Sequence, residues 1–135
     1  MMFTIPITPK AQKRDRIGSR GGHGFSYKDK GQKLEEDKIL TLMYEHRPPE
    51  PLQGPLSLEV KAYLPIPKSK PKKWQAAALS GEIRPTTKPD CSNLIKNLED
   101  IMNGVFIGDD RQVVSLSVEK WYGDPARWEI NLDCI

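Results

Sequence analysis

Side chains that can act on a phosphate group are concentrated between residues 89 and 112. The stretch Pro89 to Lys96 contains Asp90, Ser92 and Lys96, and the acidic pair Asp109-Asp110 follows at a short interval. Mg²⁺ prefers oxygen ligands, and one or two carboxylates together with substrate phosphate oxygens are enough to hold it. Carboxylates and a lysine in a chain with an excess of Lys and Arg therefore indicate phosphodiester chemistry at a divalent cation.

Length and charge favour one domain that binds a polyanion. The chain has 135 residues, with 21 Lys and Arg against 18 Asp and Glu and a net charge of +3. This length is sufficient for a single core, so we predict one domain over residues 1–135. Basic residues gather early in the chain and again in the run 68–73, away from the candidate acids. We expect contacts to the phosphates of a polyanion from Lys10, Lys13, Arg14, Arg16, Lys70, Lys72 and Lys73, although a solvated basic surface is the alternative.

Several classes of protein are disfavoured by what the sequence contains. The two cysteines, Cys91 and Cys134, lie far apart and match no zinc-ligand spacing or disulfide framework. No apolar run approaches the length of a membrane span, and the start of the chain has no cleavage pattern. We expect a cytoplasmic protein that has no membrane segment and no organic cofactor.

Hydrophobic periodicity predicts alternating strands and helices. Residues 56–64 alternate as a half-buried strand, and residues 3–7 form a shorter one. Residues 17–27 form a glycine-rich loop whose end alternates like the start of a strand. Helices are expected over residues 29–46, over a short segment with Pro71 in its first turn, and over residues 89–102. The segments 112–121 and 126–132 are predicted to be paired in a terminal hairpin.

The helix predicted over residues 89–102 has two distinct faces. Leu94, Ile95, Leu98, Ile101 and Met102 fall on one arc at 100° per residue, which predicts a face packed on a sheet. The opposite arc carries Asn93, Lys96, Asn97 and Asp100, which we expect to face a cleft or solvent.

These motifs resemble those of the RusA family of Holliday junction resolvases, typically encoded by prophages. The matching residues are Pro89 to Lys96, Asp100, Asn103-Gly104 and Asp109 to Gln112. The resemblance implies a small α+β protein with a mixed β-sheet and helices packed on it. It also implies a homodimer that binds four-way DNA junctions and cuts two opposing strands with Mg²⁺, for which Mn²⁺ is a possible substitute. Carried over by motif position, the catalytic residues are Asp90, Lys96 and Asp110.

Ser92 stands where the family pattern has a further acid, and it is a weak metal ligand. Ser92 could coordinate through a water, Glu99 or Asp109 could supply the missing charge, or the nuclease could be weak or inactive. We favour assistance by Glu99, which gives a metal-ligand set of Asp90, Asp110, Asp109 and Glu99.

The predicted function is that of a metal-dependent junction-resolving endonuclease in DNA recombination and repair. Two alternatives stay open, namely a junction-binding protein with weak or no nuclease activity and a nuclease on other branched DNA. Each of these residues taken alone also has a purely structural explanation. Asp90 is a favourable residue at a helix N-terminus, Asp109-Asp110 is typical of a turn, and Lys96 is typical of a solvated helix face.

Overall fold

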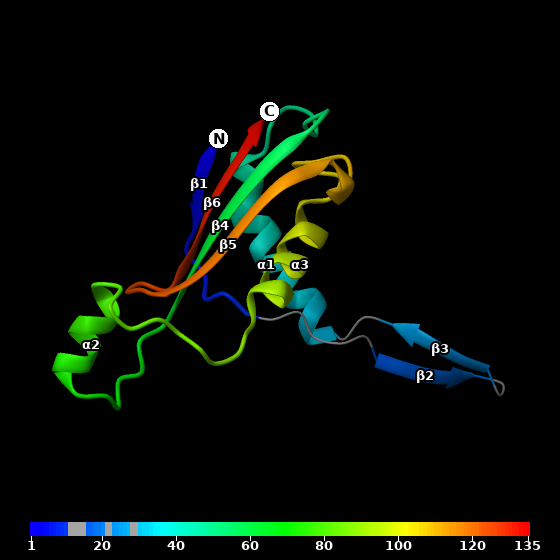
Figure 1. Ribbon diagram of the computed structural model, residues 1–135. Coiled ribbons are helices and arrows are strands. Elements are labelled where there is room, and N and C mark those ends of the chain that lie inside the picture. Colours follow the sequence, from blue (N-terminus) through cyan, green and yellow to red (C-terminus); the bar gives the residue numbers. More distant parts are fainter. Residues whose placement is uncertain (11–15, 21–22, 28–29) are drawn as a thin grey trace.

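The protein has a mixed four-stranded sheet with helices on one face (Figure 1). The computed structural model describes residues 1–10, 16–20, 23–27 and 30–135. The described elements, in chain order, are β1 (Met2–Ile5), β2 (Arg16–Arg20), β3 (His23–Tyr27), α1 (Lys30–Met43), the 3₁₀ turn η1 (Tyr44–His46), β4 (Leu56–Leu64), α2 (Lys72–Leu79), α3 (Cys91–Met102), the 3₁₀ turn η2 (Asp110–Gln112), β5 (Val113–Tyr122) and β6 (Arg127–Cys134). The predicted α+β class is confirmed.

The strands of the main sheet lie in the order β1-β6-β4-β5. β4 pairs in parallel with β5, while β6 pairs antiparallel with both β4 and β1. β1, β4 and β5 therefore run in one direction and β6 runs against them. The parallel β4–β5 pair requires a long connection, and α2 and α3 supply it.

The core lies between the sheet and the helices α1 and α3. Alternate residues of β4 from Leu56 to Leu64 are buried, as the period-two pattern predicts. They meet the apolar arc of α3, whose five predicted residues are all buried. Leu94 and Leu98 are completely enclosed, and truncating such a residue to Ala costs about 2–5 kcal/mol. This packing fixes the orientation of α3 and with it the direction of its polar residues.

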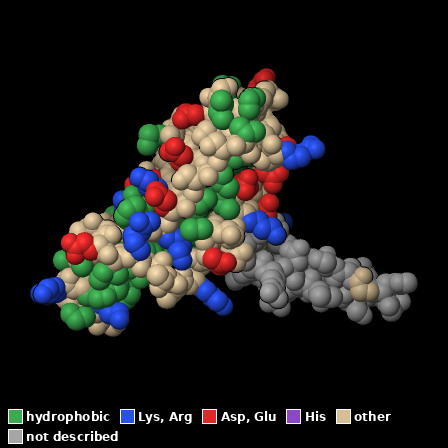
Figure 2. Space-filling view, viewed as in Figure 1, with side chains coloured by type: hydrophobic (Ala, Val, Ile, Leu, Met, Phe, Trp, Pro, Cys, Tyr) green, Lys and Arg blue, Asp and Glu red, His purple; other side chains and the backbone are tan. Residues whose placement is uncertain are grey.

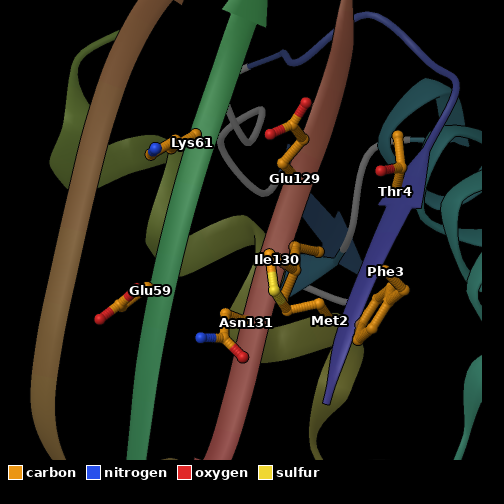
Figure 3. A pocket seen from close by; sticks show the side chains of 8 residues that line it. All are labelled: Met2, Phe3, Thr4, Glu59, Lys61, Glu129, Ile130 and Asn131. Atoms are coloured by element: carbon orange, nitrogen blue, oxygen red, sulfur yellow. The ribbon is translucent and has the colours of Figure 1, made fainter.

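The second face of the sheet is not covered by the described helices. Its side chains are mostly polar, and a shallow hollow of about 190 Å³ is lined there by Met2, Glu59, Lys61 and Asn131 among others (Figure 3). Because α1 and α3 both lie on the other face, the sequence-predicted site residues of α3 are on the helical side of the sheet (Figure 1).

Two segments project from the body of the molecule. β2 and β3 form an antiparallel pair of their own, and α2 lies at the end of a long excursion between β4 and α3 (Figure 1). Residues 17–27, predicted as a loop with the start of one strand, thus contribute to two strands. Gly18 is opposite Phe25 and Gly24 is opposite Ser19, so each of these two pairs contains one glycine. Glycine has low strand propensity, and the sequence pattern for a strand is therefore weak here.

The predicted terminal hairpin is wrong, although both of its strands exist. β5 and β6 do not pair, because β4 lies between them and is hydrogen-bonded to each. The turn after Tyr122 crosses the end of β4, and Gly123 N donates to Leu64 O at 2.9 Å. Two flanking partners enclose β4, whose alternate residues from Leu56 to Leu64 are buried.

A second correction concerns Asn97, which we expected on the exposed face of α3. Its exposed fraction is 1%, and it accepts a hydrogen bond from Gln32 Nε2 at 3.0 Å. Its amide donates to Lys10 O at 3.3 Å. Packing of α1 and of the segment after β1 against α3 covers this position, which the helical periodicity alone does not reveal.

Candidate nuclease site

One side of α3 carries several of the predicted site residues in a row. Asp90 is the N-cap residue and accepts a hydrogen bond from Asn93 Nδ2 at 3.3 Å. Positions 92, 96 and 99 follow at spacings of four and three, so they share one stripe of the helix surface. Ser92 and Lys96 are exposed, and Glu99 is half-buried. The stripe presents a hydroxyl, an ammonium group and a carboxylate along the helix.

The segment that leads into α3 is held by β5. Lys120 Nζ donates to Thr87 O at 2.7 Å and to Pro89 O at 2.9 Å. Arg84 Nε in turn donates to Lys120 O at 2.8 Å, and the Arg84 guanidinium lies 3.4 Å from the centre of the Trp121 ring. Lys120 thereby fixes the backbone on which Asp90 stands.

Lys120 was not among the predicted site residues, although the sequence contains a signal for it. In the alternation of β5 it falls on the same face as Leu116 and Val118, opposite Ala62 of β4. A lysine on the core-facing side of a strand needs acceptors for its ammonium group. The backbone carbonyls of the motif segment provide them.

The second acidic cluster is a capped turn before β5. Asp109 Oδ1 accepts from Arg111 N at 2.9 Å, and Gln112 Oε1 accepts from Asp109 N at 2.8 Å. Gln112 Nε2 also donates to Leu52 O at 2.9 Å and to Gly54 O at 3.1 Å. Asp109 also lies 3.3 Å from Arg111 Nε, so its carboxylate is committed to the turn. Asp110 is exposed beside it.

Carboxylates from the end of α3 and from this turn influence one another. Partial burial raises the pKa of Glu99, and the negative charges of Asp110 and Asp100 raise this pKa further. The side-chain hydrogen bond with Asp109 raises the pKa of Asp110, and the charge of Asp100 contributes to the same shift. The backbone N–H of Arg111 lowers the pKa of Asp109. Figure 2 shows Asp and Glu side chains gathered over the C-terminal end of α3.

The predicted metal ligands fall into two groups. Glu99, Asp109 and Asp110 lie at the C-terminal end of α3, whereas Asp90 lies at its N-terminal end. Glu99 is nine positions after Asp90, a rise of about 13.5 Å at 1.5 Å per residue. Within the described ranges, no three His, Cys, Asp or Glu side chains form a group that could hold a metal ion. Lys96 lies between the two groups.

The chemistry of the Glu99 and Asp110 carboxylates nevertheless fits a divalent cation. Mg²⁺ usually keeps several waters and needs only one or two carboxylates together with substrate phosphates. Mutual repulsion raises the cost of ionising these acids, and a cation between them would remove that cost. Ser92 offers only a neutral hydroxyl on the same stripe.

The predicted DNA-binding residues are spread over both projections and the segment after β1. Lys10 is exposed and lies 3.9 Å from Glu35 Oε2. Lys70, Lys72 and Lys73 are exposed on and before α2, with Lys70 Nζ at 5.3 Å from the centre of the Trp74 ring. Lys and Arg side chains surround α2 in Figure 2. Lys13 and Arg14 lie outside the described residues, and only the backbone of Arg16 is described, in β2.

A buried polar contact links α3 to the segment that carries Lys10. Gln32 of α1 is 2% exposed and donates to Asn97 of α3, whose amide holds the backbone of Lys10. Gln32 Nε2 also donates to Glu36 Oε1 at 3.0 Å. Buried amides of this kind are costly unless paired, so the contact fixes the relative positions of the three segments.

Comparisons with known proteins assign the whole chain to one family. The family model for endodeoxyribonuclease RusA matches residues 6–133. A crossover junction endodeoxyribonuclease RusA of Lactococcus phage r1t is 35% identical over 133 residues, covering 96% of this chain and 93% of the relative. The uncharacterized protein YqaN of Bacillus subtilis (strain 168) is 38% identical over 130 residues, covering 95% and 92% of the two chains. None of the described helices is long and apolar enough to cross a membrane.

Proposed function

Because this chain belongs to the RusA family of endodeoxyribonucleases, a family that resolves Holliday junctions, we propose that it cuts four-way DNA junctions in a metal-dependent reaction. The expected products are two symmetric nicks in opposing strands. The proposed setting is recombination and repair of DNA in the cytoplasm. The proposal is supported by the order and spacing of the motif residues on α3 and on the turn before β5.

The observation that carries the proposal is the group of carboxylates at the C-terminal end of α3. Burial raises the pKa of Glu99, and the negative charges of Asp110 and Asp100 raise it further, so these carboxylates lie within electrostatic range of one another. This proximity supports the reading in which Glu99 supplies the charge that Ser92 lacks. We assign Glu99 and Asp110 as the principal ligands of Mg²⁺, with Mn²⁺ as a substitute. Asp109 contributes less, because its oxygens already contact Arg111.

The bound cation would polarise the scissile phosphate and lower the pKa of an attacking water. Lys96 is exposed between Asp90 and Glu99 on α3, and we assign it to that phosphate. An ammonium group there stabilises the negative charge that grows on the phosphate in the transition state. Asp90 is assigned to the end of the site next to the segment held by Lys120.

We further propose that the protein acts as a homodimer. A four-way junction cut symmetrically on two strands calls for two active sites related by a two-fold axis. Light scattering coupled to size-exclusion chromatography tests this directly. A mass of two chains, retained upon dilution to working concentration, is the expected result, and a monomer that still makes paired nicks would contradict it.

The principal experiment measures cleavage of an end-labelled four-way junction in Mg²⁺ and in EDTA. Asp110→Asn is the inactive variant, and a linear duplex serves as competitor. Paired nicks that require the metal and disappear in the variant are expected. Glu99→Gln should lower the rate much more than Glu59→Gln on the uncovered face of the sheet, if Glu99 is a ligand.

The presence of Ser92 in place of the family acid favours a second candidate function, that of a junction-binding protein with little turnover. Ser92→Asp restores the family acid and so separates the two functions. If the natural chain is a weakened nuclease, the variant should cut the junction faster at unchanged junction affinity. If the wild-type protein binds the junction tightly and leaves both strands intact in Mg²⁺ and Mn²⁺, the enzyme proposal is wrong. Flap and fork substrates in the same assay test the remaining alternative, a nuclease on other branched DNA.

A further inference from the structure

A groove of about 270 Å³ opens where the three parallel strands end. Leu64 at the end of β4 and Tyr122 at the end of β5 form part of its wall, together with Thr8 and Pro9 beyond β1 and residues 87–89 before α3. Open sheets commonly bind ligands outside the carboxyl ends of their parallel strands. The groove is close to the lower end of the range of about 300–1,000 Å³ for small-ligand pockets.

The lining combines flat apolar surface with a few polar groups. Among the lining residues, Leu64 and Pro9 are buried, while Pro65 and Pro67 are exposed. The Tyr122 ring is supported by an edge-on contact with Trp74, with ring centres 5.5 Å apart and planes at 63°. Thr8, Thr87 and Lys88 add hydroxyl and ammonium groups. A nucleobase has this same combination of two apolar faces and a polar edge.

The surroundings of the groove favour DNA over other flat ligands. Pro89 lines the groove and Asp90 follows it directly, Lys10 follows Pro9, and the basic run 68–73 follows Pro67. Three of the segments that form the groove therefore continue into residues assigned to catalysis or to the DNA backbone. A strand whose phosphates contact these residues would have a base within reach of the groove.

We propose that this groove binds one unpaired nucleobase at the branch point of the DNA substrate. The inference rests on the proposed function for its choice of DNA, and it adds a site that reads a base rather than a phosphate. Tyr122 would stack on the base, while Thr87 and Lys88 would contact its edge or its phosphate. Bases are commonly held on aromatic side chains in this way once they leave the duplex stack.

The test uses a junction that carries 2-aminopurine either at the branch point or in the middle of an arm. Fluorescence is recorded during titration with the protein in EDTA, so that no cleavage is involved. We expect a change at the branch point and none in the arm. Tyr122→Leu should abolish the change and weaken junction binding about tenfold, in line with the removal of one aromatic–base stacking interaction.

Two matched controls separate base binding from general effects. Tyr63→Leu alters the neighbouring strand on the opposite face of the sheet, where Tyr63 lies against Arg127 at 3.9 Å, and it should preserve the signal. Thr87→Val should reduce the signal while Thr86→Val preserves it, which keeps the test valid if Tyr122→Leu folds poorly. Equal signals in Thr87→Val, Thr86→Val and wild type, or an equal signal from the arm, would overturn the inference.

The two proposals can fail separately. A branch-point signal that depends on Tyr122 in a protein that never cuts DNA would leave the groove assignment standing and would contradict the nuclease. Metal-dependent paired nicks without any branch-point signal would support the nuclease proposal and contradict the groove assignment.

Discussion

At the scale of single residues, the site depends on which carboxylates face one another. Asp109 and Asp110 are adjacent in sequence but differ in role, because the first caps the turn and the second is exposed beside it. Burial raises the pKa of Glu99 in the last turn of α3, and the negative charge of Asp110 raises this pKa further. The sequence alone identified all three as candidates and favoured Glu99 over Asp109 as the replacement for the missing acid.

The raised pKa of Glu99 predicts a pH-dependent loss of stability in the absence of metal. Below pH 4.5, the ordinary value for this group, the carboxyl is protonated whether the chain is folded or unfolded. As the pH rises through the raised pKa, the unfolded state releases the proton more readily, so the folded state loses stability. Glu99→Gln should therefore unfold at a higher temperature than wild type at neutral pH in EDTA and show little difference below pH 4.5.

Thermal unfolding followed by circular dichroism measures this difference. Glu59→Gln on the uncovered face of the sheet is the control and should behave like wild type at both pH values. A Glu99→Gln variant that is less stable than wild type at neutral pH would show that the carboxylate is stabilised and not repelled.

Lys96 is predicted to act on the transition state more than on binding. Lys96→Met should lower kcat by about 10²–10³-fold, the range seen when a single stabilising group is removed. Junction affinity should change by much less, because many other cations contact the backbone. Single-turnover cleavage and gel-shift titration measure the two effects, with Lys33→Met on α1 as control. Equal reductions in affinity and rate would assign Lys96 to substrate binding.

At the scale of elements, α3 is positioned from both sides. Its apolar arc packs on the sheet, and its buried Asn97 is hydrogen-bonded to Gln32 of α1. The start of the helix is held by Lys120 of β5 through two backbone carbonyls. The helix carrying the predicted site is thus attached to α1, to β5 and to the Lys10 segment.

The Gln32–Asn97 pair should contribute measurably to stability. Asn97→Ala removes one hydrogen-bond acceptor of the buried Gln32 amide, which costs about 1–3 kcal/mol. A double-mutant cycle with Gln32→Ala, measured by urea unfolding, isolates the coupling between the two residues. Additive effects would show that the hydrogen bond contributes nothing beyond the separate side chains.

The same elements show how far the sequence determines the fold. The alternation of residues 56–64 gives the bounds of β4 correctly, and the apolar arc of α3 is buried as predicted. The predicted strand pairing is wrong, because alternation identifies a buried face but not the neighbour across the hydrogen bonds. Asn97 is misplaced for a similar reason, since a helical arc does not show which further segment covers it. The alternation of β5 places Lys120 on the core-facing side, but it does not show which acceptors the ammonium group finds, because these are backbone atoms distant in sequence.

At the scale of the whole molecule, several of the described basic residues lie on a segment that projects from the core. Lys70, Lys72 and Lys73 accompany α2, which extends away from the sheet (Figure 1). Contacts made through such residues recognise phosphate and carry little sequence information. We therefore expect the projections to position the DNA and α3 to carry the catalytic residues.

Replacing Lys70, Lys72 and Lys73 by Gln should weaken binding to every DNA form by a similar factor. The slope of log Kobs against log salt should become shallower by about 0.9 for each phosphate that the replaced lysines no longer neutralise. Fluorescence anisotropy at several salt concentrations measures this slope. Lys61→Gln on the uncovered face serves as the control, and an unchanged slope in the triple variant would remove α2 from the DNA interface.

The position of β6 in the sheet has a consequence for the protein during its synthesis. β6 is the strand that joins β1 to β4, so β1 has no partner in the sheet until residues 127–134 are available. Before then β4 can pair only with β5, and a two-stranded sheet is marginal in water. A ribosome that has translated as far as Pro125 has made every predicted catalytic residue, but the nascent chain still lacks the strand that completes the sheet. Nuclease activity should therefore appear only after β6 has emerged from the exit tunnel.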